Sequence, residues 1–395
     1  MTRQSKYDFD TVIDRRNTDS IKWNVAENVL PMWVADMDFR TAPEILDALK
    51  IRLDHGVFGY ADVPEAWYNA YINWWDRRHH LEMEKENLIF SAGVMPSIFS
   101  LVKRFAAPGE NVIIQSPVYN NFYNCIANSG CNVVENQLVY KNGEYSIDFA
   151  DLEQKFSDSQ TNLMILCNPH NPIGKIWNAE DLAKIGELAK KYNVTVISDE
   201  IHCDITEPGT HYVPFAAASE TCREVSVTCI APTKTFNLAG LHSSAVYVAN
   251  TTLRRKVCHA LHTDKIAAPN SFATVAAIAA FERGELWLES LREYLWNNRK
   301  LVEEFLAKEL PEIKAVKGDA TYLMWLDISA LLETGRNVAA YLKRKTGLFV
   351  IGGDAYGSGG EHFLRMNIAC PRSVCLEGLN RLKQGVYTYN PQYIR

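Results

Sequence analysis

The fold is decided by the stretch Ala231-Pro232-Thr233-Lys234-Thr235-Phe236-Asn237-Leu238-Ala239-Gly240, which places a lysine just after a short apolar segment. That segment, residues 225–230, is rich in β-branched side chains, which is typical of a buried strand. Asp199 follows a similar segment at residues 194–198, and Asn171 follows another at residues 163–167. The sequence therefore predicts three strands, each followed by a polar residue.

These three polar residues are expected to form one site. In open α/β sheets, ligand-binding groups gather beyond the carboxyl ends of the strands, so Asn171, Asp199 and Lys234 can converge there. Their chemical types fit pyridoxal phosphate (PLP), since an amine can hold this aldehyde as a Schiff base and a carboxylate can keep the pyridine nitrogen protonated. An amide is a suitable donor to the phenolic oxygen. A lone lysine after a strand is usually a surface lysine, but the combination of three predicts a PLP site.

Length and composition agree with a large enzyme. The chain has 395 residues, of which 47% are hydrophobic, so two lobes with substantial cores are expected. Its net charge of -6 argues against nucleic-acid or membrane binding. The first eight residues lack an apolar signal core and no run reaches transmembrane length, which predicts a cytoplasmic protein. The nine cysteines form no Cys-x-x-Cys pair, which is typical of reduced thiols.

The order of apolar segments predicts an α/β fold with two domains. Between residues 87 and 249, strand-like runs alternate with helical patterns such as residues 179–192, which indicates a mostly parallel sheet covered by helices. After residue 271, helical patterns at 286–306 and 337–345 alternate with strand-like runs at 322–327 and 362–367. We therefore expect a large PLP-binding domain at residues 45–270. A smaller α+β domain would combine residues 271–395 with the N-terminal segment 1–44.

The chain resembles the fold-type I PLP enzymes of the aminotransferase class I/II superfamily over nearly its full length. Within that superfamily it is most similar to carbon–sulfur β-lyases of the MalY/PatB type, the cystathionine β-lyases. The resemblance rests on residues 31–39, 58–60, 168–172, 198–204, 231–240 and 365–372. Each segment alone is a weak signal, but the lysine segment and the Asp-Glu-Ile-His segment are specific in combination.

The resemblance implies a set of cofactor-binding residues: Tyr60, Gly93, Val94, Met95, Tyr119, Asn171, Asp199, His202, Thr233 and Lys234. Residues 93–95 would be the phosphate turn, because a glycine before a helix lets backbone N–H groups close on an anion. Tyr119 would stack on the cofactor ring and act with Lys234 and Asp199 as a catalytic residue. His202 would be a donor near a cofactor oxygen, although a satisfied core histidine is an equal alternative.

The resemblance also implies a homodimer with a shared active site. Tyr60 would cross to the phosphate of the neighbouring subunit, unless it packs beneath the helix that follows it. Arg365 would grip the α-carboxylate of an amino-acid substrate, with Val34 and Asn171 beside it. Arg372 is a nearby alternative to Arg365. His242 stands where many aminotransferases carry an arginine for the phosphate.

The reaction implied is PLP-dependent β-elimination of cystathionine or other cysteine thioethers, giving pyruvate, ammonia and a thiol. An aminotransferase would use the same lysine, aspartate, asparagine and arginine, so it remains an alternative. A regulatory binding protein that retains the fold is a second alternative, from another class.

No metal site is expected. His79 and His80 lie in a segment whose aromatic residues recur at helical spacing, which indicates a packed face. The glycine-rich run at residues 352–360 lacks the spacing of a nucleotide-binding fingerprint and is interpreted as a small-domain loop.

Overall fold

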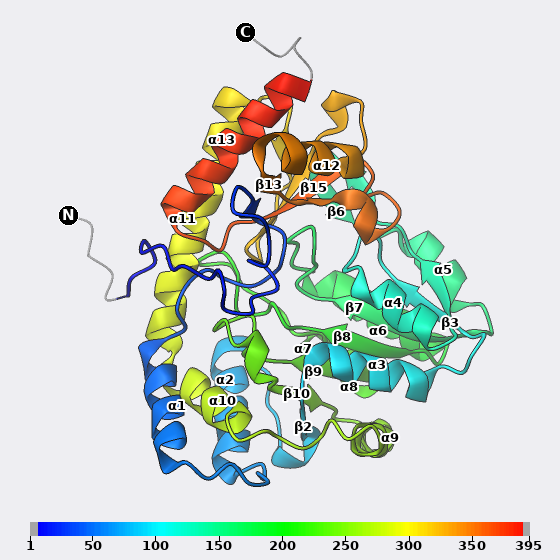
Figure 1. The fold of residues 1–395 in the computed structure, drawn as a ribbon. Coiled ribbons are helices and arrows are strands. Elements are labelled where there is room, and N and C mark those ends of the chain that lie inside the picture. Colours follow the sequence, from blue (N-terminus) through cyan, green and yellow to red (C-terminus); the bar gives the residue numbers. More distant parts are fainter. Residues whose placement is uncertain (1–6, 390–395) are drawn as a thin grey trace.

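A seven-stranded sheet forms the centre of the large lobe in the computed structural model, which describes residues 7–389 (Figure 1). Its strand order is β2-β10-β9-β8-β7-β3-β4, and only β10 runs antiparallel to its neighbours. The strands are β2 (Leu88–Ser91), β3 (Asn111–Ile114), β4 (Asn132–Glu135), β7 (Thr161–Cys167), β8 (Thr195–Asp199), β9 (Ser226–Ile230) and β10 (Ser244–Tyr247). The predicted α/β fold with a mostly parallel sheet is confirmed.

Helices cover both faces of this sheet. Alternate residues of β7 point to opposite faces, so Leu163 and Ile165 join one apolar cluster while Met164 and Leu166 join another. The first cluster includes residues of α3 (Val94–Phe105), α4 (Asn121–Asn128) and α9 (Thr251–Thr263). The second includes residues of α5 (Phe149–Phe156), α6 (Ala179–Lys191), α7 (Phe215–Ala218) and α8 (Glu220–Val225). Burial on both faces explains why the predicted strands are almost continuously apolar.

A smaller antiparallel sheet has the order β11-β12-β15-β14. Its strands are β11 (Lys314–Ala315), β12 (Leu323–Asp327), β14 (Ile351–Gly352) and β15 (Phe363–Asn367). Three helices accompany it, namely α11 (Glu285–Glu309), α12 (Gly335–Thr346) and α13 (Arg372–Tyr389). A separate hairpin is made by β5 (Val139–Lys141) and β6 (Glu144–Ser146).

The N-terminal segment runs beside the small sheet. Its strand β1 (Leu30–Pro31) pairs in parallel with β13 (Leu348–Phe349). The following helices, α1 (Pro43–His55) and α2 (Glu65–His79), pack against α10 (Ala273–Arg283). Figure 1 shows α11 rising from this helical group toward α13. The domain limits proposed from the sequence stay a prediction, and residues 1–6 and 390–395 of the proposed small domain lie outside the described part.

Among residues 7–389, no helix combines the length and apolar character that crossing a bilayer requires. The signal-free start predicted from the sequence falls mostly on residues 1–6, outside the described part.

A buried charge cluster anchors the N-terminal segment. Lys22 is only 1% exposed, and its ammonium group lies 2.7 Å from a carboxylate oxygen of Asp38. Arg15 binds the other oxygen of Asp38 at 2.7 Å and also pairs with Asp36 at 2.7 Å. The indole N–H of Trp23 donates to Asp38 at 2.8 Å. Because Lys22 has no route to solvent, the cluster is stable only while Asp38 remains charged and in place.

We predict that Asp38→Asn lowers the free energy of unfolding by about 3 kcal/mol, because buried Lys22 loses its close carboxylate and retains only Asp36, at 3.6 Å. Urea denaturation at neutral pH measures the loss. The control is Glu224→Gln, which removes a half-exposed ion pair with Lys190 and should cost less than about 1 kcal/mol. Equal losses in the two variants would contradict this account of the cluster.

Candidate active site

A cavity of about 230 Å³ lies where β7, β8 and β9 end. Asp199 is the last residue of β8, and its register partners are Cys167 on β7 and Cys229 on β9. The predicted residues that line the cavity are Gly93, Val94, Met95, Tyr119, Asn171, Asp199, His202, Thr233 and Lys234. The expected convergence of the three strand ends is therefore seen in the structure.

Lys234 is buried in the cavity, and its amine has a hydrogen-bond partner and a lowered pKa. Its Nζ donates a hydrogen bond of 2.5 Å to the backbone carbonyl of Ala35 in the N-terminal segment. Burial lowers the pKa of Lys234 to about 8, and the charge of Arg365 acts in the same direction, while Asp36 and Asp199 oppose it. A lowered pKa increases the neutral fraction of the amine, which is the form that attacks an aldehyde and accepts protons.

Asp199 is a buried carboxylate with few partners of its own. It accepts a 3.2 Å hydrogen bond from the backbone N–H of Ile201. Burial raises the pKa of Asp199 to about 7, against the effects of that hydrogen bond and of Lys234. A cationic ring nitrogen placed in the cavity would restore the charged carboxylate, so the residue fits the pyridine end of PLP.

The side-chain carbonyl of Asn171 is already occupied by a hydrogen bond within the protein. Its Oδ1 accepts a 3.2 Å hydrogen bond from Nη1 of Arg365. This bond fixes the orientation of the amide and leaves the NH₂ group as a donor at the cavity wall. The arrangement matches the donor expected beside the phenolic oxygen of the cofactor.

The opposite end of the cavity is suited to an anion. Helix α3 begins at Val94, and its N-cap Gly93 has φ 153° and provides no side-chain cap. The free N–H groups of the first turn can therefore bind a phosphate, in agreement with the predicted turn. Thr233 and His242 line the same cavity. His242 therefore lies at the cavity wall at the position where many aminotransferases carry an arginine for the phosphate.

The role of His202, as a cofactor donor or as a core histidine, stays a prediction. It is buried, lines the cavity, and its Nδ1 has no hydrogen-bond partner among the described residues. Burial lowers the pKa of His202 to about 3, helped by the positive charges of Lys234 and Arg365. A neutral ring with an unpaired nitrogen fits a ligand contact better than a satisfied core histidine.

Arg365 lies just behind the cavity rather than in its wall. Its Nη2 donates to the carbonyl of Trp33 at 2.8 Å, and the guanidinium lies 5.0 Å from the ring centre of Tyr356. Its Nε has no partner among the described residues. The alternative Arg372 is exposed at the start of α13 and does not line the cavity.

Val34 and Tyr60, which were also predicted as site residues, do not line the cavity. Val34 lies one residue before Ala35, which does line the cavity, and its carbonyl accepts a bond from Asn367. Tyr60 is fully exposed on the single chain. This position does not place Tyr60 at the cavity of its own chain, so a role there requires a second subunit.

Hydrogen bonds from Asn367 and Tyr322 to the N-terminal segment, which were not predicted from the sequence, form a polar clamp over the site. Asn367 donates from Nδ2 to the carbonyls of Val34 at 2.5 Å and Asp36 at 2.7 Å. The hydroxyl of Tyr322 donates to the carbonyl of Ala35 at 3.0 Å. These bonds hold the N-terminal segment against Lys234. No local pattern marked Asn367 or Tyr322, because their partners are distant in the sequence.

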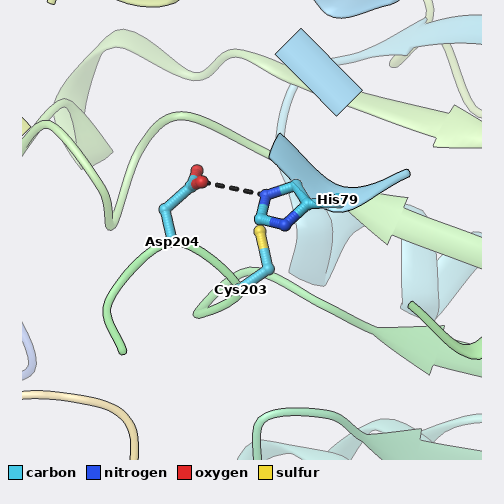
Figure 2. A group of neighbouring side chains, drawn as sticks. All are labelled: His79, Cys203 and Asp204. Atoms are coloured by element: carbon cyan, nitrogen blue, oxygen red, sulfur yellow. Dashed lines mark hydrogen bonds and ion pairs between the residues drawn. The ribbon is translucent and has the colours of Figure 1, made fainter. Parts of the chain in front are cut away.

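His79, Cys203 and Asp204 form a buried group (Figure 2) that has the residue types of metal ligands. The Asp204 carboxylate, however, is already bonded to the imidazole of His79 at 2.9 Å and to the hydroxyl of Thr235 at 3.1 Å. Although burial acts to raise it, the pKa of Asp204 is lowered to about 2 by these bonds and nearby Arg78, whose Nε lies 3.5 Å away. A cation would meet the charge of Arg78, so we interpret the group as a hydrogen-bond network that braces the Lys234 turn.

Comparison with known proteins agrees with the fold and the site. Residues 27–382 match the family model for aminotransferase class I and II, and the chain belongs to this family. It is 42% identical over 381 residues to "Cystathionine beta-lyase PatB" of Bacillus subtilis, covering 95% of this chain and 98% of that protein. This relative confirms the predicted resemblance to lyases of the MalY/PatB type.

Two solved structures are similarly close. Cystalysin from Treponema denticola, which contains a pyridoxal 5′-phosphate cofactor, has a TM-score of 0.94 and 33% identity over 97% of this chain and 99% of that one. A PLP-bound putative aminotransferase from Clostridium difficile has a TM-score of 0.93 and 38% identity over 96% of this chain and 100% of that one.

The site predicts which lysine carries the cofactor. Purified protein should be yellow, and Lys234→Ala should lose the visible absorbance, because Lys234 is the one lysine that lines the described cavity. Borohydride reduction and peptide mapping should place the label on Lys234. Lys175→Ala serves as the control and should keep the absorbance. A label on Lys175 or Lys265 would refute the assignment.

Proposed function

We propose that this chain is a PLP-dependent lyase that cleaves the carbon–sulfur bond of cystathionine and related cysteine thioethers, giving pyruvate, ammonia and a thiol. The convergence of Asn171, Asp199 and Lys234 in one cavity carries the proposal, together with the 42% identical relative named as a cystathionine beta-lyase. The fold alone would also suit an aminotransferase.

Separate residues of the chain bind the ring, the phosphate and the substrate carboxylate. PLP, when bound, supplies an electron sink for the pair left as the α-proton departs. Asp199 keeps the ring nitrogen positively charged, and Tyr119 covers the ring face. Thr233 and the first turn of α3 hold the phosphate. Arg365 binds the α-carboxylate through a planar pair of donors, beside Val34 and Asn171.

Lys234 is the general base in this scheme. Its amine, once free, takes the α-proton, and a pKa of about 8 leaves part of it neutral at physiological pH. The carbonyl of Ala35 accepts a hydrogen bond from this amine and so orients it in the cavity. His202, with its unpaired nitrogen, is assigned to a cofactor oxygen.

The active enzyme is proposed to be a homodimer. Tyr60 is fully exposed and follows exposed apolar residues Val57 and Phe58, which a second copy of the chain would cover. Tyr60 of one chain would then reach the phosphate in the other. A cytoplasmic location is supported by the nine cysteines, all of which are free thiols.

The charge of the site favours a lyase over a dicarboxylate aminotransferase. Such an aminotransferase needs a second cation for a side-chain carboxylate held inside the cavity, where the described lining has no arginine and Lys234 is the one lysine. Arg336 and Lys343 line a separate cleft and suit a longer substrate. A lyase needs only the α-carboxylate clamp of Arg365 and a path for the departing sulfur.

The reaction itself is the decisive test. Incubated with cystathionine and no keto acid, the protein should release pyruvate, ammonia and homocysteine over many turnovers, while Lys234→Ala should release none above background. Coupled pyruvate assays and amino-acid analysis measure the products. Multiple turnovers that occur only when a keto acid is added, with a new amino acid accumulating in step, would identify an aminotransferase instead.

A mixed dimer tests the shared site. Tyr60→Phe should bind the cofactor weakly and Lys234→Ala should be inactive, so each homodimer lacks activity. A heterodimer of the two should regain one complete site, made of Tyr60 from one chain and Lys234 from the other. Activity after subunit exchange, measured against each variant alone, gives the result. Full activity in an isolated wild-type monomer would rule out the shared site.

A further inference from the structure

A second cleft, of about 430 Å³, opens beside the active site. It lies between α12 and the chain around β13 and β14. One wall is apolar, because the indole of Trp33 stacks on the ring of Phe349 at 4.8 Å between centres. The cleft also contains polar residues: Asn120, Arg336, Lys343 and Asp354. No comparison assigns a function to this cleft.

Three connections join the cleft to the candidate active site. Trp33 lines the cleft with its side chain, while its carbonyl binds Arg365. Asn120 follows Tyr119, which lines the cofactor cavity. Ile351 lies opposite Arg365 in the antiparallel pair of β14 and β15, so the two side chains project from the same face of the sheet. The cleft is therefore linked to Arg365 through Trp33 and strand β14, while the linings of the cleft and the cavity remain separate.

The two cations of the cleft form no ion pair among the described residues. Arg336 and Lys343 are seven residues apart on α12, which places them on one face of the helix. Both are exposed, and neither has an ion-pair partner among residues 7–389, although Lys343 lies 3.6 Å from the ring centre of Phe349. Asp354 accepts the backbone N–H of Arg336 at 2.7 Å through Oδ2. Two cations and a single carboxylate thus line the same cleft.

This pattern matches one half of a thioether that joins two amino acids. Its leaving half carries both a carboxylate and an ammonium group, several bonds beyond the sulfur. We propose that the cleft binds this leaving amino acid, with its carboxylate at Arg336 and Lys343, its ammonium at Asp354, and its methylene chain against Trp33. The proposal rests on the lyase function proposed above and adds the residues that select cystathionine-type substrates.

If the cleft binds the leaving amino acid, removing its cations should lower kcat/KM only for substrates that have a charged leaving group. Charge-assisted hydrogen bonds at a partly exposed site account for about a tenfold effect on binding. The double variant Arg336→Gln/Lys343→Gln should lower kcat/KM for cystathionine about tenfold, mainly through KM, because the lost contact is far from the bond that breaks. S-methylcysteine has no charged leaving group, so its kcat/KM should change less than about twofold.

The experiment compares both substrates in wild type, the double variant and a matched control. The control is Arg344→Gln, which removes an exposed cation from the same helix outside the cleft. Thermal unfolding confirms that each variant is folded. Added salt should weaken wild-type selectivity for cystathionine, since screening acts on exposed charges.

The outcomes separate the two proposals. If wild type cleaves both substrates and the double variant loses kcat/KM equally for both, or for neither, the cleft proposal is overturned and the lyase function stands. An equal loss of selectivity in Arg344→Gln also overturns it, because the effect would then be general to the charge of α12. If wild type releases pyruvate from neither substrate, the lyase function fails and the cleft proposal fails with it.

Discussion

The parallel alignment of β7, β8 and β9 is the constraint on which the rest of the site depends. Because these strands run in the same direction and are neighbours, their carboxyl ends deliver Asn171, Asp199 and Lys234 to one place. The strands are apolar on both faces and covered by helices, so the position of these ends is fixed by the core. Strand β15 of the small sheet then contributes Arg365, which donates a hydrogen bond to Asn171.

Closure of the site depends on backbone carbonyls of the N-terminal segment. The carbonyls of Trp33, Val34, Ala35 and Asp36 are bound by side chains of Arg365, Asn367, Tyr322 and Lys234. A segment without regular structure can be held this way because each buried carbonyl needs a donor. The buried Lys22–Asp38 pair anchors the same segment from its other side.

Much of the fold could be predicted because the large-lobe strands have a strong local signal. The expected segment at residues 194–198 became β8 (Thr195–Asp199), an error of one residue that left Asp199 at the strand end. The antiparallel direction of β10 could not be predicted, since apolar patterning does not report strand direction. Residues such as Asn367 were missed for a related reason. Its partner Val34 is 333 residues away in the sequence, and only the tertiary fold brings the two together.

Burial disfavours the charged forms of the two ionisable groups at the centre of the cavity. For Asp199, burial raises the pKa to about 7 from 3.8, so the carboxylate's contribution to stability is present at low pH and is lost as the pH rises through that interval. For Lys234, burial lowers the pKa to about 8 from 10.5, so stability is gained as the pH rises from about 8 toward 10.5. At pH 7 both groups are therefore held in an unfavourable environment. PLP would supply Asp199 with a positive partner at the ring nitrogen and Lys234 with an aldehyde to bind, so both side chains would gain a partner. The strain that burial places on these two side chains is thus relieved by the ligand that the site is built to hold.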